Sequence, residues 1–113
     1  MSAKKQIQDL SKEFLPKIID IRRNLHSNPE LSFQEFETSK YIKSILADWG
    51  IPFQDGIADT GIVVLLKGNK PEKSCTALRA DFDALPIKEE NEVEYCSKND
   101  GIMHACGHDA HTA

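Results

Sequence analysis

The run Gly61-Ile-Val-Val-Leu-Leu66 predicts a buried β-strand, because Ile62 to Leu66 is continuously apolar and rich in β-branched side chains. A second apolar run, Thr76 to Ala80, leads into Asp81 and predicts another buried strand. Residues 67–73 contain glycine, asparagine and proline, which favour turns, so they predict a hairpin-like connection between the two strands.

Two helices are predicted before these strands. From Lys5 to Leu25 the apolar residues recur at steps of three and four, and Pro16 should kink this helix or mark a restart. Ser32, with Glu35 three residues later, is a candidate N-cap for a second helix that extends to Trp49. Two helices followed by strands predict an α/β layered domain.

The composition is that of an ordinary globular protein. The chain of 113 residues is 40% hydrophobic and 28% charged, and it carries a net charge of −4. The basic residues are scattered, so nucleic acid is not an expected partner, and no stretch is apolar enough for a signal peptide or a membrane span. Three irregularly spaced cysteines argue against a disulfide framework. We therefore expect a cytoplasmic protein that does not bind membranes.

The strongest local signal is the run His104-Ala-Cys-Gly-His-Asp-Ala-His111. Imidazole and thiolate are preferred ligands of zinc and related divalent ions, and Gly107 would let the chain bend so that Cys106 and His108 face one ion. His111 would lie one helical turn further on, near the side of His108. Asp109 is a candidate cap for a helix beginning at Ala110, and the chain ends at that helix nucleus, which suggests truncation.

The same run is compatible with three alternatives to a metal-binding site of this kind. The polar residues could simply cap and hydrogen-bond the backbone at a loop-to-helix junction. A structural zinc knuckle is disfavoured because Cys75 and Cys96 lack the paired spacing of such sites. A cysteine-nucleophile hydrolase would use Cys106 with a nearby imidazole, but the sequence offers no evident oxyanion donor.

A second signal is Arg79-Ala-Asp-Phe-Asp-Ala-Leu-Pro86, in which two carboxylates follow an apolar run. Asp81 and Asp83 should face the same side of an extended chain, and one of them could hydrogen-bond a metal-binding histidine. The alternative is a solvated strand end in which Arg79 pairs with an acid.

Several other polar residues predict structure rather than chemistry. His26 lies near a helix C-terminus, where a cationic side chain suits the backbone carbonyls. The glutamates between Glu89 and Glu94 predict a solvated surface. Cys75 is interpreted as a buried small side chain, and Cys96 as an incidental thiol.

Taken in order, three segments resemble the opening part of the peptidase M20 family. The resemblance is to its branch of N-acyl-amino-acid amidohydrolases, which includes hippurate hydrolase and indole-acetic-acid (auxin)-conjugate hydrolases. The segments are residues 22–35 (RRNLHSNPELSFQE), 78–86 (LRADFDALP) and 103–113 (MHACGHDAHTA).

The resemblance implies a site with two divalent metal ions, zinc, manganese, cobalt or nickel. Cys106 and His108 would be metal ligands, and Asp83 would be an acid that contacts a ligand without binding the metal itself. Asp81 stands where other branches of the family have a histidine ligand. The other family ligands and the glutamate general base would lie beyond Ala113.

The implied activity is hydrolysis of the amide bond of a small N-acyl amino acid by a metal-activated water. Residues 1–113 would form the N-terminal part of a catalytic α/β domain with a mostly parallel sheet, without the rest of that domain or the dimerisation domain. The full-length protein could form a homodimer, whereas the fragment should be inactive, with exposed strand edges and poor stability. The alternative is a non-catalytic metal-binding remnant of an interrupted gene.

Overall fold

A computed structural model describes all of residues 1–113. Along the chain it contains, in order, α1 (Ala3–Ser27), α2 (Phe36–Asp48), β1 (Phe53–Ile57), β2 (Gly61–Val64) and α3 (His108–Thr112). Helices and a small sheet confirm the α/β class. None of the helices combines the length and apolar character needed to cross a lipid bilayer.

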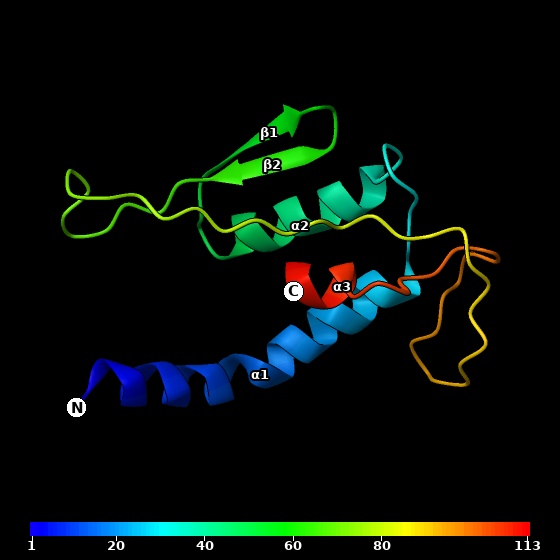
Figure 1. Ribbon diagram of the computed structural model, residues 1–113, viewed down its shortest axis with the longest axis horizontal. Coiled ribbons are helices and arrows are strands. Elements are labelled where there is room, and N and C mark those ends of the chain that lie inside the picture. Colours follow the sequence, from blue (N-terminus) through cyan, green and yellow to red (C-terminus); the bar gives the residue numbers. More distant parts are fainter.

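Helix α1 runs unbroken through Pro16. Ser2 caps its N-terminus, where its hydroxyl accepts a hydrogen bond from the Lys5 amide at 3.3 Å. The axis of α1 bends along its length (Figure 1), as expected for a helix with an internal proline. The expected kink therefore occurs without a restart.

Helix α2 begins at Phe36, and the prediction that Ser32 caps it is wrong. The cap comes instead from Glu30, whose carboxylate accepts hydrogen bonds from the Glu37 amide at 3.2 Å and the Thr38 amide at 2.6 Å. A carboxylate at this end of a helix satisfies free N–H groups and interacts favourably with the helix dipole. The hydroxyl of Ser32 instead donates to the Asp83 carboxylate.

The only regular sheet is an antiparallel hairpin of β1 and β2, in which Phe53 pairs with Val64. The turn between them places Ala58 and Asp59 at positive φ. Strand β2 confirms a strand after Gly61, but the predicted burial of that run is wrong, because its last two residues, Leu65 and Leu66, are 63% and 74% exposed.

The predicted strand at residues 76–80 is absent, and the segment is an extended, exposed connection. A strand needs a neighbour for its backbone N–H and C=O groups, and these residues have none. Residues 67–73 therefore join no second strand. Parallel pairing, expected for most of the sheet, is confined to an isolated bridge between Leu31 and Ala84.

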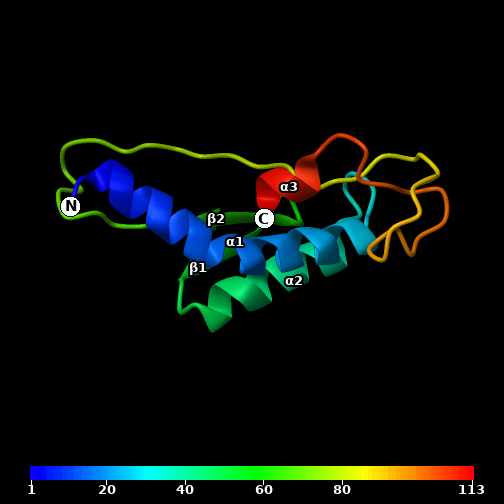
Figure 2. The same ribbon diagram turned by 90° about the horizontal axis from the view of Figure 1, so that it is seen from below.

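The core is small and lies where α3 packs against the second half of α1 (Figures 1 and 2). Only 12 of the 113 residues are buried. The buried residues without polar side chains are Ile21, Leu25, Pro29 and Ala84, whereas the buried polar ones are His26, Ser27, Glu35, Thr38, Ser39, Thr60, His104 and Asp109. Polar side chains therefore outnumber apolar ones among the buried residues.

Candidate metal centre

A tight turn before α3 carries the residues predicted to bind metal. Gly107 is the N-cap of α3 with φ of 103°, a left-handed conformation that L side chains rarely adopt. The turn places Cys106 just before the helix and His108 at its first position. The prediction that Asp109 caps a helix starting at Ala110 is wrong, since the helix starts at His108 and the Asp109 side chain is buried.

The imidazole of His108 is oriented by Asp83. Its Nδ1 lies 2.8 Å from Asp83 Oδ1 and 3.1 Å from the Asp83 carbonyl oxygen. Both oxygens are acceptors, so Nδ1 donates, and the matching tautomer carries its lone pair on Nε2. A carboxylate commonly accepts a hydrogen bond in this way from one ring nitrogen of a histidine whose other ring nitrogen binds metal.

The Asp83 carboxylate is itself held from the other side. Its Oδ2 accepts a hydrogen bond from the Ser32 hydroxyl at 2.5 Å. This hydrogen bond is the main reason that the pKa of Asp83 lies below its usual value; partial burial opposes the effect and the hydrogen bond from His108 adds to it. Asp83 is therefore a fixed, ionised acceptor.

Asp81 faces the opposite nitrogen of the same imidazole. Its Oδ2 lies 4.0 Å from His108 Nε2, and its Oδ1 pairs with the Arg79 guanidinium at 2.8 Å. The expectation that both carboxylates face one side is met, and the alternative pairing with Arg79 is present as well. The two acids thus flank His108.

The three cysteines are unpaired thiols. Cys106 is exposed next to the turn, and Cys96 is half-buried. The prediction that Cys75 is buried is wrong, because it lies in the exposed connection after β2. His111 lies close to the turn, with its ring centroid 6.2 Å from that of His108.

The donor chemistry of this turn fits a borderline divalent ion. Cys106 offers sulfur and His108 offers a free Nε2, which are the donors that zinc and similar ions prefer. No group of three or more histidine, cysteine or acidic side chains within residues 1–113 is arranged to hold an ion. These residues therefore supply part of a coordination sphere and do not complete one.

A buried ionic network beside the turn was not predicted. His26 donates from Nδ1 to Asp109 Oδ2 at 2.8 Å and from Nε2 to Glu89 Oε1 at 2.9 Å. Arg22 Nε also contacts Asp109 Oδ2, at 2.9 Å. The structural role expected of His26 is confirmed, but its partners are carboxylates instead of helix carbonyls. The prediction that Glu89 is solvated is wrong, because its side chain is only 4% exposed.

His104 is the fourth histidine of this region and is also buried. Neither ring nitrogen has a hydrogen-bond partner within the chain, and the same is true of Asp109 Oδ1. Burial lowers the pKa of His104 below 6.5, and the charge of Asp109 opposes this only in part. Burial therefore favours the neutral form of the His104 imidazole.

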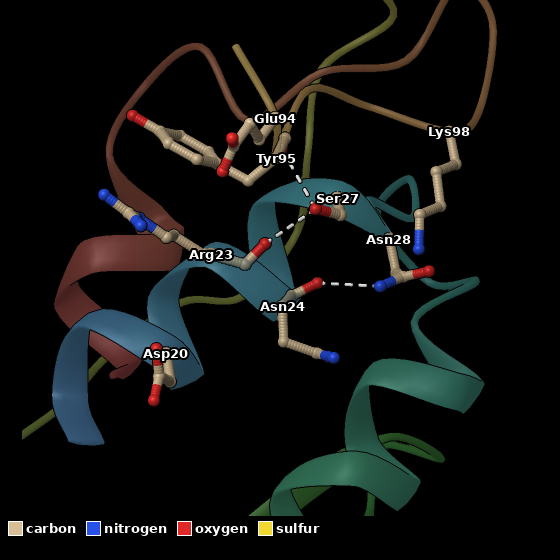
Figure 3. A pocket seen from close by; sticks show the side chains of 8 residues that line it. All are labelled: Asp20, Arg23, Asn24, Ser27, Asn28, Glu94, Tyr95 and Lys98. Atoms are coloured by element: carbon tan, nitrogen blue, oxygen red, sulfur yellow. Dashed lines mark hydrogen bonds between the residues drawn. The ribbon is translucent and has the colours of Figure 1, made fainter. Parts of the chain in front are cut away.

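A surface hollow of about 260 Å³ lies along the outer side of the α1 C-terminus (Figure 3). Its lining residues are Asp20, Arg23, Asn24, Ser27, Asn28, Glu94, Tyr95 and Lys98. The Arg23 guanidinium lies over the Tyr95 ring at 4.7 Å, and the other charges are mixed in sign. The hollow shares no residue with the turn around Gly107.

Comparison with known families matches residues 77–113 to the family described as Peptidase family M20/M25/M40. This segment contains Asp81, Asp83, Cys106 and His108. The matched part of the chain is therefore the part that carries the candidate centre.

Comparison with individual proteins extends the similarity over most of the chain. Thermostable carboxypeptidase 2 of Saccharolobus solfataricus is 50% identical over 103 residues, which cover 90% of this chain and 26% of that protein. An uncharacterized hydrolase of Staphylococcus epidermidis is 55% identical over 91 residues, covering 80% of this chain and 23% of its own length. The chain thus spans about a quarter of these relatives.

A solved structure shares the fold. The Bacillus subtilis YXEP protein, described as a dinuclear metal-binding peptidase of the M20 family, superposes with a TM-score of 0.83 at 47% identity. The match covers 89% of this chain and 28% of that protein.

Proposed function

This chain belongs to the peptidase M20 family, and we propose on that premise that it supplies part of the dinuclear metal centre of a hydrolase. The proposed reaction is cleavage of the amide bond of N-acyl amino acids. The observation that carries the proposal is the hydrogen bond from His108 Nδ1 to Asp83, which leaves Nε2 without a hydrogen bond; Cys106, two positions earlier, is an exposed free thiol.

Each residue of the proposed centre has a distinct part. Cys106 and His108 bind metal, and Asp83 keeps the His108 ring in the tautomer that presents Nε2. Bound divalent ions would activate water for attack and polarise the amide carbonyl. The remaining ligands and the general base are assigned to residues outside this segment.

The substrate class rests on two considerations. The motifs at residues 78–86 and 103–113 resemble the N-acyl-amino-acid amidohydrolase branch. A relative is called a carboxypeptidase, and a carboxypeptidase cleaves the amide that precedes a C-terminal amino acid. An N-acyl amino acid is the smallest molecule with that bond and a free carboxylate.

The three free thiols favour a reducing compartment, so we place the protein in the cytoplasm.

A non-catalytic metal-binding role is the second candidate. It is favoured by one observation, that residues 1–113 bring together no third ligand. In that case the protein binds an ion through Cys106 and His108 without turnover.

The test is an assay of the protein expressed from its complete reading frame with N-acetyl- and N-benzoyl-amino acids. We expect hydrolysis that a chelator abolishes and added divalent metal restores. Cys106→Ser and His108→Gln should lose most of it, and Cys75→Ser, which alters an exposed thiol outside the centre, should retain it. Bound metal without hydrolysis would favour the second candidate. Activity that survives chelation but not thiol alkylation would contradict the metal centre and favour a cysteine nucleophile.

A further inference from the structure

Asp109 is the most thoroughly buried charged side chain of the centre, with 1% of the residue exposed. It is adjacent in sequence to His108, but the two side chains leave α3 in different directions. His108 contacts Asp83, whereas Asp109 contacts Arg22 and His26 of α1. Consecutive positions of a helix diverge in this way because each residue turns the helix by about 100°.

The contacts of Asp109 join α3 to α1. Arg22 Nε and His26 Nδ1 both lie within 2.9 Å of Asp109 Oδ2, and they come from positions one helical turn apart on the same face of α1. His26 is held in turn by Glu89, whose Oε1 accepts from Nε2 at 2.9 Å. Arg22, His26 and the two carboxylates thus form one connected chain of polar contacts, buried except at Arg22.

Helix α3 depends on contacts with other parts of the chain. It is five residues long, and such a helix is far too short to be stable without tertiary contacts. Its N-cap residue is Gly107, which has no side chain that could accept hydrogen bonds from the first N–H groups of the helix. Besides Asp109, two residues anchor it: His108 Nδ1 donates to Asp83, and the Thr112 hydroxyl donates to the Asp81 carbonyl oxygen at 2.8 Å.

We propose that Asp109 is a positioning residue that acts through α3: its contacts with Arg22 and His26 set the placement of Cys106 and His108, and so the affinity for metal. This inference rests on the proposed function, because it takes Cys106 and His108 as ligands. Under this proposal α1 contributes no metal ligand itself but controls the geometry of the ligands. Contacts behind metal ligands typically change affinity by about 10- to 100-fold when they are removed.

The experiment measures Co²⁺ affinity by chelator competition and records the thiolate-to-cobalt absorption band of the protein expressed from its complete reading frame. Asp109→Asn keeps the shape of the side chain and removes its charge. We expect affinity to fall at least tenfold and the absorption band to shift. The matched control is Thr60→Val, which removes a buried hydrogen bond from the turn before β2 to Glu35, the N-cap residue of α2, away from α3. Both variants should lower the melting temperature of the metal-free protein, but the control should keep the wild-type affinity and spectrum.

A second pair of variants covers the case in which Asp109→Asn fails to fold. The Arg22 side chain is 33% exposed, so it can be changed with less disruption. Arg22→Met should weaken Co²⁺ binding, and Arg22→Lys, which retains the cation, should restore part of it. If Asp109→Asn or Arg22→Met binds Co²⁺ with wild-type affinity and spectrum, the positioning role is overturned and the metal site stands. If the wild type binds no Co²⁺, or Cys106→Ser binds it unchanged, the proposed function fails and this inference fails with it.

Discussion

Asp83 illustrates, at the scale of single residues, how one carboxylate links two distant segments. It accepts from Ser32, 51 positions earlier, and from His108, 25 positions later. Its pKa is held below the ordinary 3.8, chiefly by the Ser32 hydroxyl. The stabilisation that this ionised group provides is therefore present above pH 3.8 and is lost as the pH falls through the lower folded-state pKa.

Replacing Ser32 by alanine should raise the pKa of Asp83 towards 3.8, because the largest contribution to the shift is removed. The measurement is an NMR pH titration of the Asp83 carboxyl carbon. Ser44→Ala is the control, since the Ser44 hydroxyl donates to a backbone carbonyl within α2 and not to Asp83. An unchanged Asp83 pKa in Ser32→Ala would contradict this assignment.

Glu89 gives a second prediction with a defined pH dependence. Burial raises its pKa, but hydrogen bonds from His26, the Ser97 amide and Asn91 together lower it below 4.5. Glu89→Gln should reduce the free energy of unfolding at neutral pH by about 1–3 kcal/mol, since it weakens a buried charged contact. The deficit should shrink as the pH falls below 4.5, where the wild type loses the same stabilisation.

Urea denaturation across this pH range measures the effect. Glu92→Gln provides the control, because Glu92 is an exposed neighbour on the same loop. A deficit for Glu89→Gln that stays constant with pH would show that the Glu89 charge does not stabilise the fold.

At the scale of elements, the sequence predicts helices well and their boundaries poorly. The spacing of apolar residues locates α2, but its cap comes from Glu30, six positions before its first residue, Phe36. The hydroxyl of Ser32 has the right spacing for a cap and is taken by Asp83 instead. Strand β1 was missed because its sequence, Phe-Gln-Asp-Gly-Ile, includes two residue types that are depleted in strands.

The capping role of Glu30 predicts a local loss of stability. Glu30→Gln should lower the free energy of unfolding by about 0.5–2 kcal/mol, the range for loss of an N-terminal cap. Hydrogen exchange of the Glu37 and Thr38 amides should accelerate, because these are the groups that Glu30 holds. In the control, Glu37→Gln alters an exposed acid of the same helical turn and should leave the Thr38 amide protected. Equal exchange in wild type and Glu30→Gln would exclude the cap.

At the scale of the whole molecule, predictability depends on sequence distance. Cys106 and His108 stand out because they lie two positions apart in a short run of ligand-type residues. The contact of His26 with Asp109 spans 83 residues and that with Glu89 spans 63. No local pattern signals such pairings, since each depends on how α1, α3 and a loop fold together.

The distribution of apolar side chains also predicts behaviour in solution. The radius of gyration is 15.9 Å, against about 13 Å for a compact domain of this length. Large hydrophobic side chains lie exposed on the first half of α1 and after β2, among them Leu10, Phe14, Leu66 and Leu78. Exposed apolar surface on this scale favours association.

The 113-residue chain on its own should therefore bind 8-anilinonaphthalene-1-sulfonate and self-associate as its concentration rises. Dye fluorescence and sedimentation velocity measure these two properties. A monomer that binds no dye and unfolds in one sharp transition would contradict the expectation.

The proposed function requires that Cys106 and His108 bind the same metal centre. X-ray absorption spectroscopy of the zinc-loaded protein, expressed from its complete reading frame, measures the ligand atoms themselves. We expect a sulfur shell at about 2.3 Å together with nitrogen at about 2.0–2.1 Å, and loss of the sulfur shell in Cys106→Ser. A wild-type spectrum without sulfur, or a sulfur shell that persists in Cys106→Ser, would show that Cys106 is not a ligand and would overturn the proposed centre.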